Sequence, residues 1–379
     1  MKVAVIIVDN REDHGRYEDP KPFFGMAPAA LVDGFAQLPE VEIHVISCLQ
    51  RPVRSPEKLA SNIFYHSLVV PKLGWLRAGY LGCIAAVRRK LREIKPDIVH
   101  GQGTERYCAL CAAFSGYPNV VTIHGNMRAV ARALRARLLS FNWITARLEA
   151  LTLPRTQGVL CNSVYTELET LNLAKKTWRV PNALQPIFLE EPSLIPRAKP
   201  PILITAATFS PYKQQAEILD CLQRLRDRGF DFKMLFAGKS DSPYGTKVLE
   251  RLTQPQTACF AQYIGLKSAE ELKAVLDSAS AMIHFPVEEA FGLSAAEGLA
   301  RNLKLFCART GGLVDIANEV EGVELFDAKD WQGLERSIGA WLIAGAPTPV
   351  SSAEVMQRRY HPLSVARRTV EIYREILAT

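Results

Sequence analysis

The sequence predicts an α/β protein built from two doubly wound, parallel-sheet halves. The chain has 379 residues, which is too long for one ordinary hydrophobic core and suits two domains. Short apolar, β-branched runs alternate with longer amphipathic stretches, as in a series of strand-helix units. That series occurs twice, on either side of a proline-containing stretch with weak periodicity. Two Rossmann-like halves therefore follow from length and pattern together.

Each half contains several expected strands. In the first half they are KVAVIIV, VEIHVISC, DIVHG, NVVTIHG and GVLCNS, and in the second ILITAAT, FKMLFAG, CFAQYIG, AMIHFP, KLFCA and VELF. The first run reads as a buried strand rather than a secretion signal, because Asp9 and Asn10 end it and no small-residue cleavage site follows. The segment KSAEELKAVLDSA predicts a helix that begins with a capping box formed by Ser268 and Glu271.

The domain bounds follow from these elements. Residues 1–183 form a first domain, 184–200 a linker, and 201–361 a second domain. The second domain does not need residues 362–379, an amphipathic helix, to complete its sheet. We expect this helix to pack back on the first domain.

Composition and charge restrict the class of protein. Hydrophobic residues make up 48% and charged residues 22%, the balance of a soluble globular chain, and no run reaches the length of a membrane span. Net charge is +7, and residues 66–150 carry 13 Lys or Arg against 4 Asp or Glu. This excess favours an anionic substrate or membrane surface, and nucleic acid ranks last because no nucleic-acid-binding motif accompanies it. The eight cysteines lack disulfide or zinc spacing, which favours a reducing cytoplasm; the pair Cys108 and Cys111 is expected to be inert core.

The segment HFPVEEAFGLSAAEGLA holds the most informative pattern. A strand is expected to end at Phe285, an acidic loop follows, and a helix begins near Leu293. Seven residues separate Glu289 in the loop from Glu297, which lies about one turn into the helix. Ligands of open parallel sheets bind outside the carboxyl ends of the strands, so two carboxylates there suit a hydroxyl-rich ligand. The helix N-terminus at Phe291, Gly292 and Leu293 favours an anion such as a diphosphate.

This segment resembles the E-x7-E motif of the family-4 retaining glycosyltransferases of GT-B fold. VLCNSVYTELETL with VPNAL, TGGLVDIA after KLFCA, and YHPLSVARRTVEIYREIL resemble further parts of that family, so the resemblance covers nearly the whole chain. It implies that Glu289 holds the hydroxyls of the donor sugar and Glu297 those of the ribose. The amides of Phe291, Gly292 and Leu293 would bind the phosphates.

The resemblance implies further donor contacts in the second domain. The family carries an Arg and a Lys in the loop after the first strand of this domain, here TAATFSPYKQQAEIL. Lys213 occupies the lysine position, whereas Thr208 stands at the arginine position, so less positive charge faces the diphosphate than in the family. Gly238 and Ile264, from the runs FKMLFAG and CFAQYIG, complete the expected donor contacts.

In the first domain the resemblance implies His124 and Gly25 as site residues. His124 ends the run NVVTIH and would position the donor sugar or an acceptor hydroxyl, with general-base action as an alternative. Gly25 follows a long charged loop, NREDHGRYEDPKPFFG, which is expected to be either a lid or a disordered segment. His100 is expected to be structural, and His284 a strand residue.

The prediction is therefore a hexosyltransferase that uses a nucleotide-diphosphate sugar, a UDP-sugar before a GDP-sugar, and a glycan or lipid-linked acceptor. It needs no metal, because no Asp-x-Asp motif or cluster with metal-ligand spacing occurs. Two alternatives remain: a sugar-nucleotide epimerase or hydrolase of the same fold, and a non-catalytic interaction protein. The segment 126–151 is expected to form one long basic helix, and in the preceding segment Trp75 and Tyr80 are expected to lie beside basic residues. Both features are typical of proteins that bind anionic membranes. The alternative is that both segments are helices that cover the sheet.

Overall fold

The computed structural model describes residues 1–193 and 197–379, which form two compact units. Unit 1 contains residues 1–185 and 360–379, and unit 2 contains residues 186–359. The unit boundary therefore falls two residues after the predicted end of the first domain. The rest of the predicted linker belongs to unit 2, apart from residues 194–196, which lie outside the described residues.

Unit 1 is built on a sheet of eight strands in the order β3-β4-β2-β1-β5-β6-β7-β8. The strands are β1 (Lys2–Ile6), β2 (Glu42–Leu49), β3 (Lys58–Ala60), β4 (Ile63–Val69), β5 (Ile98–Gln102), β6 (Asn119–Ile123), β7 (Gly158–Cys161) and β8 (Thr177–Arg179). All neighbours pair in parallel except β3, which is antiparallel to β4. The expected sheet is thus found, but it is mixed at one edge.

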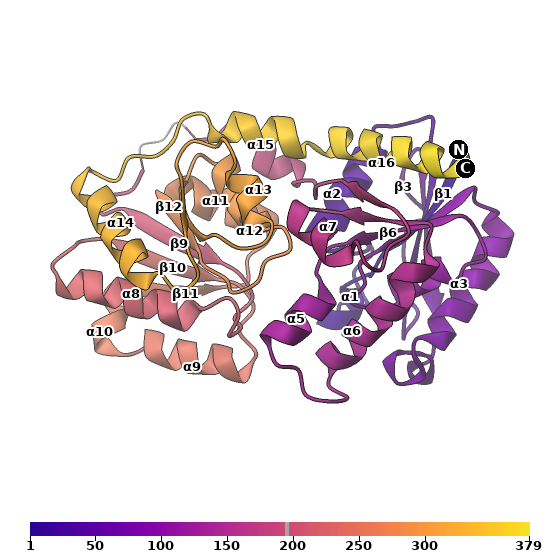
Figure 1. Ribbon diagram of the computed structural model, residues 1–379, viewed down its shortest axis with the longest axis horizontal. Helices are drawn as coiled ribbons and strands as arrows, with labels where there is room; N and C mark the ends of the chain where they lie inside the picture. Colours follow the sequence, from indigo (N-terminus) through magenta and orange to yellow (C-terminus); the bar gives the residue numbers. More distant parts are fainter. Residues whose placement is uncertain (194–196) are drawn as a thin grey trace. The chain divides into compact units, whose positions relative to one another are not determined.

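Helices cover both faces of this sheet (Figure 1). They are α1 (Arg11–His14), α2 (Met26–Phe35), α3 (Leu81–Ile94), α4 (Tyr107–Ala113), α5 (Met127–Ala133), α6 (Phe141–Thr152), α7 (Val164–Thr170) and α16 (Pro362–Leu377), with short 3-10 turns at Lys72–Gly74, Leu76–Ala78 and Leu153–Arg155. Because side chains of a strand alternate between faces, Val3 and Val5 of β1 pack in the core with α2 and α16, and Ala4 and Ile6 pack in the core with α3 and α4. The C-terminal helix α16 lies beside α2 in unit 1.

Unit 2 has a parallel sheet of six strands in the order β11-β10-β9-β12-β13-β14. The strands are β9 (Ile202–Ala206), β10 (Lys233–Ala237), β11 (Ala261–Gly265), β12 (Ala281–His284), β13 (Lys304–Ala308) and β14 (Val323–Phe326). The helices are α8 (Gln215–Asp227), α9 (Pro243–Leu252), α10 (Pro255–Ala258), α11 (Ala269–Ser278), α12 (Leu293–Ala300), α13 (Leu313–Ala317), α14 (Trp331–Ile343) and α15 (Ser352–Tyr360), and a 3-10 turn spans Pro186–Leu189. The predicted capping box at Ser268 and Glu271 opens α11.

Two expectations, about the segment 126–151 and about the strand before the acidic loop, are wrong. The single helix over 126–151 is two helices, α5 and α6, because Arg135 and Leu139 have left-handed backbones and Ser140 caps a new helix. Trp75 and Tyr80 are buried in the core of unit 1 with α3, which agrees with the alternative of a sheet-covering helix for that segment. The strand before the acidic loop ends at His284, one residue earlier than expected.

Among the described residues no helix is long and apolar enough to cross a membrane. All eight cysteines are unpaired, and burial raises the pKa of the Cys108 and Cys111 thiols well above their usual range. The expectation that this pair is inert core is consistent with both observations.

Candidate active site

In each sheet the strand order reverses at one point, and the loops on either side of that point are where α/β proteins bind ligands. In unit 2 the reversal lies between β9 and β12. Lys213 lies in the loop after β9, and Glu289 in the loop after β12. The topology therefore brings together two residues that are 76 positions apart in the sequence.

Lys213 and Glu289 form a largely buried ion pair. The Lys213 Nζ atom lies 2.6 Å from Glu289 Oε2, and the His284 Nε2 atom lies 2.7 Å from the same oxygen. Burial alone raises the pKa of the Glu289 carboxyl, but the charge of Lys213 and the contact with His284 outweigh it, so this pKa lies well below its usual range. Burial lowers the pKa of Lys213, but Glu289 more than compensates and the net direction is upward. Both side chains are charged at neutral pH.

Backbone and side-chain hydrogen bonds hold the two loops against each other. The Val287 N–H donates to the Tyr212 carbonyl at 2.7 Å, and Gln214 Nε2 donates to the Phe285 carbonyl at 2.6 Å. The loop with Glu289 is also tied to a third loop, because the Gly312 N–H donates to the Glu289 carbonyl at 3.0 Å. The position of Lys213 relative to Glu289 thus depends on the backbone as well as on their charges.

Gly292 lies at the N-cap of α12 with a left-handed φ of 105°. Only glycine adopts this conformation readily, and an added Cβ would also lie 2.6 Å from the Leu313 side chain. Gly292 offers no side chain to cap the helix, so the first amides of α12 are not satisfied in the usual way. Phe291 is buried directly before it, and Leu293 begins the helix as expected.

Glu297 projects from α12 and is buried, with 1% of its surface exposed. Neither carboxylate oxygen has a hydrogen-bond partner in the described part of the chain. Burial raises its pKa to about 7. A buried acid without a partner is costly unless something outside the chain supplies hydrogen bonds. The surroundings of Glu297 therefore indicate that its carboxylate binds a ligand.

The other predicted donor residues have less distinctive surroundings. Thr208 is exposed after β9, and its carbonyl accepts a hydrogen bond from Gln215 Nε2 at 3.1 Å. Gly238 follows β10 and approaches the Ala207 backbone. Ile264 is half-buried within β11.

In unit 1 His124 directly follows β6, and both of its ring nitrogens are engaged. Nδ1 lies 3.1 Å from Asn182 Oδ1, and Nε2 lies 2.8 Å from Gln102 Oε1. Burial lowers the pKa of His124 to about 4, although a contact with Asn182 acts in the opposite direction. The imidazole is therefore neutral and held in place, so action as a general base would require it to release one of these amides.

His100 lies deeper in the same sheet. Its Nδ1 is 2.5 Å from the Tyr373 hydroxyl of α16, and its Nε2 is 2.6 Å from Thr122 Oγ1. Because it is fully buried between these two hydroxyls and beside Gln102, it connects α16 to the sheet. This arrangement agrees with the structural role expected for it.

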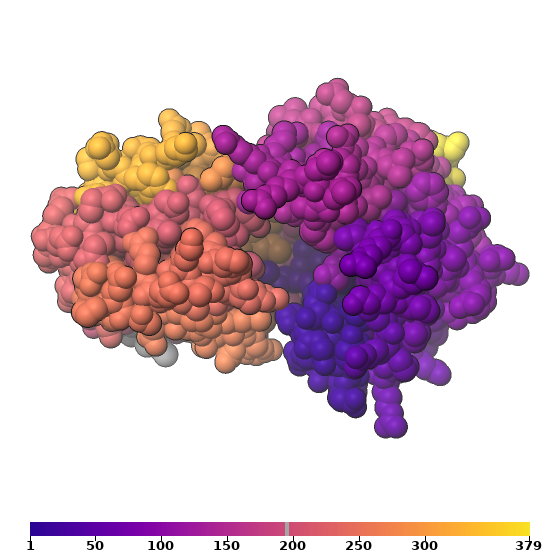
Figure 2. Space-filling model, turned by 90° about the horizontal axis from the view of Figure 1, so that it is seen from below, coloured from indigo at the N-terminus to yellow at the C-terminus, as the bar shows by residue number. Residues whose placement is uncertain are grey.

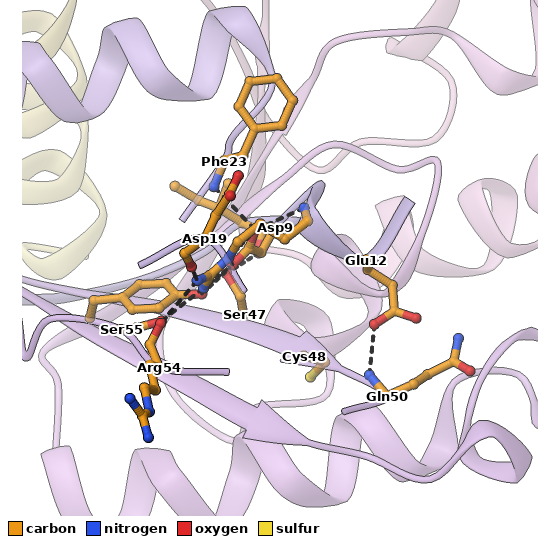
Figure 3. Close-up of polar contacts among 12 residues, drawn as sticks. Asp9, Glu12, Asp19, Phe23, Ser47, Cys48, Gln50, Arg54 and Ser55 are labelled. Carbon is orange, nitrogen blue, oxygen red and sulfur yellow. Dashed lines mark hydrogen bonds and ion pairs between the residues drawn. The ribbon is translucent and has the colours of Figure 1, made fainter. Parts of the chain in front are cut away.

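Gly25 is the N-cap of α2 and ends the long charged loop that follows β1. Near the start of this loop Arg11 forms an ion pair with Asp9, and neither side chain is exposed. Figure 3 shows Asp9 together with Asp19, Phe23 and Ser55, which come from both ends of this loop and from the segment before β3. Arg11 also donates hydrogen bonds to the Asp19 carbonyl, 2.7 Å, and Ser55 Oγ, 2.8 Å, and Asp9 accepts one from Tyr65, 2.7 Å. The loop is therefore fastened to β4 and to the segment before β3, which contradicts a disordered segment.

Several residues in these sites carried no motif. Gln102 and Asn182 hold His124, His284 contacts Glu289 although it was expected to be only a strand residue, and Asp9 and Arg11 fasten the loop after β1. One signal in the sequence could have pointed to some of these residues, namely a position at the end of a parallel strand or directly after it. Gln102 and His284 each occupy the last position of a strand. Which neighbour each contacts depends on strand order.

Two family profiles match most of the chain. Residues 29–185 match the family described as "Glycosyltransferase Family 4", and residues 189–351 match "Glycosyl transferases group 1". Together with the two sheets, these matches identify the chain as a glycosyltransferase of GT-B fold. None of the curated proteins matches the chain in sequence.

Solved structures share this fold along their whole length. Sucrose-phosphate synthase from Thermosynechococcus elongatus is 16% identical, with a TM-score of 0.79 and coverage of 100% of this chain and 99% of that one. HepE from Anabaena, in complex with UDP and glucose, is 14% identical with a TM-score of 0.70 and coverage of 98% and 99%. The lipopolysaccharide outer core galactosyltransferase WaaB is 13% identical with a TM-score of 0.65 and coverage of 99% and 100%. At these identities the likeness concerns the fold.

Proposed function

We propose that this glycosyltransferase moves a hexose from a nucleotide-diphosphate sugar, with a UDP-sugar favoured over a GDP-sugar, to a hydroxyl of a glycan or lipid-linked acceptor, with retention of configuration. The observation that carries the proposal is the buried, unpartnered carboxylate of Glu297 in α12, the helix that follows the loop with Glu289, whose ion pair with Lys213 lies at the switch point of unit 2. The complex of HepE with UDP and glucose, which shares the fold, supports a UDP-sugar.

Each donor-site residue has a role that fits its surroundings. Lys213 and the N-terminal amides of α12 neutralise the charge on the leaving diphosphate. The ionised Glu289 accepts hydrogen bonds from the sugar, and Glu297 accepts them from the ribose hydroxyls. Among the described residues no group of three or more His, Cys, Asp or Glu side chains could hold a metal ion, so the proposal assigns the phosphate charge to Lys213 and α12.

Retention follows most simply from front-side attack. The acceptor oxygen forms a bond to the anomeric carbon while the bond from that carbon to the diphosphate oxygen breaks. A phosphate oxygen takes the proton of the acceptor hydroxyl, so no protein base is needed. His124, with both ring nitrogens engaged, then acts by shaping the acceptor side of the reaction in unit 1.

Donor binding tests the role of Glu297. Ribose hydroxyls donate to the ionised carboxylate, so binding lowers its pKa from about 7 and releases a proton. The affinity for UDP-glucose, which has no phosphate that titrates near neutrality, is therefore expected to rise roughly tenfold from pH 6 to pH 8. Glu297→Gln should bind more weakly and lose this dependence.

Thermal-shift titration with UDP-, GDP- and ADP-sugars identifies the donor, and calorimetry at each pH measures the affinity. Equal pH dependence in wild type and Glu297→Gln would show that Glu297 does not contact the donor. Product analysis without acceptor separates transfer from the hydrolase or epimerase alternative.

We further propose that unit 1 binds an anionic membrane surface, which would give access to a lipid-linked acceptor. The connection between α5 and α6, coloured magenta in the view from below (Figure 2), exposes 72% of Leu138 and 70% of Leu139. Arg135 and Arg137 are exposed beside them, so apolar and basic groups lie together as membrane-surface segments require.

Flotation with vesicles tests this surface. We expect the protein to float with phosphatidylglycerol vesicles and not with phosphatidylcholine vesicles, and the double variant Leu138→Ser, Leu139→Ser to float several-fold less. Ile343→Ser, which changes a residue that is 78% exposed in unit 2, is the matched control. Flotation without dependence on anionic lipid, or unchanged flotation of the double variant, would contradict the proposal.

A further inference from the structure

Glu105 lies at the second switch point of the molecule. In unit 1 the strand order reverses between β1 and β5, and Glu105 is in the short loop between β5 and α4. Ligands of doubly wound sheets bind at such a reversal. No motif marks this residue, and the roles proposed above do not use it.

Two glycines leave room for the Glu105 carboxylate beside His124. Its Oε1 accepts a hydrogen bond of 2.8 Å from the Gly125 N–H. A Cβ added to Gly125 would lie 3.0 Å from Oε1, and one added to Gly103 would collide with Oε2. Gly103 also has a left-handed φ of 88°, which a larger residue adopts only with strain. The ends of β5 and β6 are therefore shaped around this carboxylate.

The Glu105 carboxylate has capacity for another hydrogen bond. Its side chain is half-buried, and from the residues that the structure describes the one hydrogen bond to it from another residue is that of Gly125, on Oε1. The neighbouring His124 has both nitrogens occupied by Asn182 and Gln102. Of these two adjacent groups, Glu105 is the one with an oxygen available to an incoming hydroxyl.

Burial, more than the neighbouring charges, brings the pKa of Glu105 close to neutral pH. Burial raises its pKa to about 7, and the nearby carboxylate of Glu149 acts in the same direction. The Gly125 N–H and Arg106 oppose this effect, but Arg106 is itself paired with Asp13 at 2.7 Å. Burial, and after it the charge of Glu105, raise the pKa of the Cys108 thiol well above its usual range.

We propose that Glu105 binds a hydroxyl of the acceptor sugar, through the oxygen that Gly125 leaves free, and so determines which acceptor enters unit 1. The inference rests on the proposed function, because it requires that the enzyme transfer a sugar to a hydroxyl of an acceptor. The ionised carboxylate accepts the hydroxyl proton in a charge-assisted hydrogen bond, which is stronger than a neutral one. The hydroxyl oxygen is thereby oriented next to His124.

The test is transfer from UDP-glucose to p-nitrophenyl glycosides, measured from pH 5.5 to 8.5 for wild type and Glu105→Gln. The glutamine keeps an oxygen for the Gly125 N–H but cannot ionise. We expect the KM for the glycoside to rise roughly tenfold and the KM for UDP-glucose to stay unchanged. At saturating UDP-glucose, where the titration of free Glu297 does not contribute, the limb of the acceptor kcat/KM profile near pH 7 should disappear. Glu93→Gln, which neutralises an exposed carboxylate of unit 1, is the control and should behave as wild type.

A second variant, at a glycine without a left-handed backbone, protects the test against misfolding. Gly125→Ala keeps the charge of Glu105 but places a Cβ 3.0 Å from its Oε1, and it should also raise the glycoside KM. If both variants keep the wild-type glycoside KM and pH profile, the role of Glu105 is refuted while the proposed function stands. If wild type binds UDP-glucose but transfers glucose to none of the glycosides, this inference fails while the donor assignment stands; if it binds no nucleotide sugar, the proposed function fails as well.

Discussion

Replacing Glu289 with Gln is expected to lower kcat for sugar transfer by roughly 10²–10³, and Lys213→Ala by a similar factor. In Glu289→Gln the Lys213 ammonium remains largely buried without its counter-charge, and the contact of 2.7 Å with His284 is altered. In Lys213→Ala the charge that keeps the Glu289 pKa low is lost, and less positive charge meets the leaving diphosphate. Both effects are measured as initial rates of sugar transfer to an acceptor, with the nucleotide sugar that thermal shift identifies as the donor.

The double variant separates these effects from general damage. Because the two side chains act as a unit, we expect the double variant to lose little more activity than either single variant. Glu270→Gln changes an exposed carboxylate at the start of α11 and should leave kcat unchanged. Wild-type kcat in either single variant would refute the assignment of that residue.

Arg11→Ala is expected to reduce the free energy of unfolding of unit 1 by about 3–5 kcal/mol, the cost of leaving one partner of a buried ion pair alone. Arg11 and Asp9 are both fully buried, and Arg11 joins the start of the loop after β1 to Asp19 and Ser55. For a unit of this size the corresponding decrease in Tm is roughly 6–20 °C. Calorimetry and urea unfolding measure it.

The control for this prediction is Arg16→Ala, since Arg16 pairs with Asp19 at the surface and such pairs contribute about 0–1 kcal/mol. Asp9→Asn combined with Arg11→Met removes both charges, and we expect it to be more stable than Arg11→Ala. Equal Tm values for Arg11→Ala and Arg16→Ala would contradict the importance of the buried pair.

Much of the fold could be predicted from the sequence because its signals are local. Every predicted strand is present, and the capping box at Ser268 and Glu271 opens its helix. Strands β3, β4 and β8 were not predicted, and each is defined by its pairing with a neighbour: β4 with β2, β3 with β4, and β8 with β7. The break between α5 and α6 was also missed, because their continuous periodicity does not reveal a left-handed residue.

The candidate sites show the same division. The spacing of Glu289 and Glu297 and the glycine between them placed one carboxylate in a loop and the other in a helix, because strand-loop-helix patterns are encoded by neighbouring residues. Strand order alone brings Lys213 to Glu289, and Glu105 to Gly125. The sequence by itself therefore determined the two-sheet architecture and the acidic donor segment. The tertiary structure decided which carboxylates are paired, unpartnered or close to neutral, because burial and the nearest charges set these properties and both depend on how distant strands are ordered.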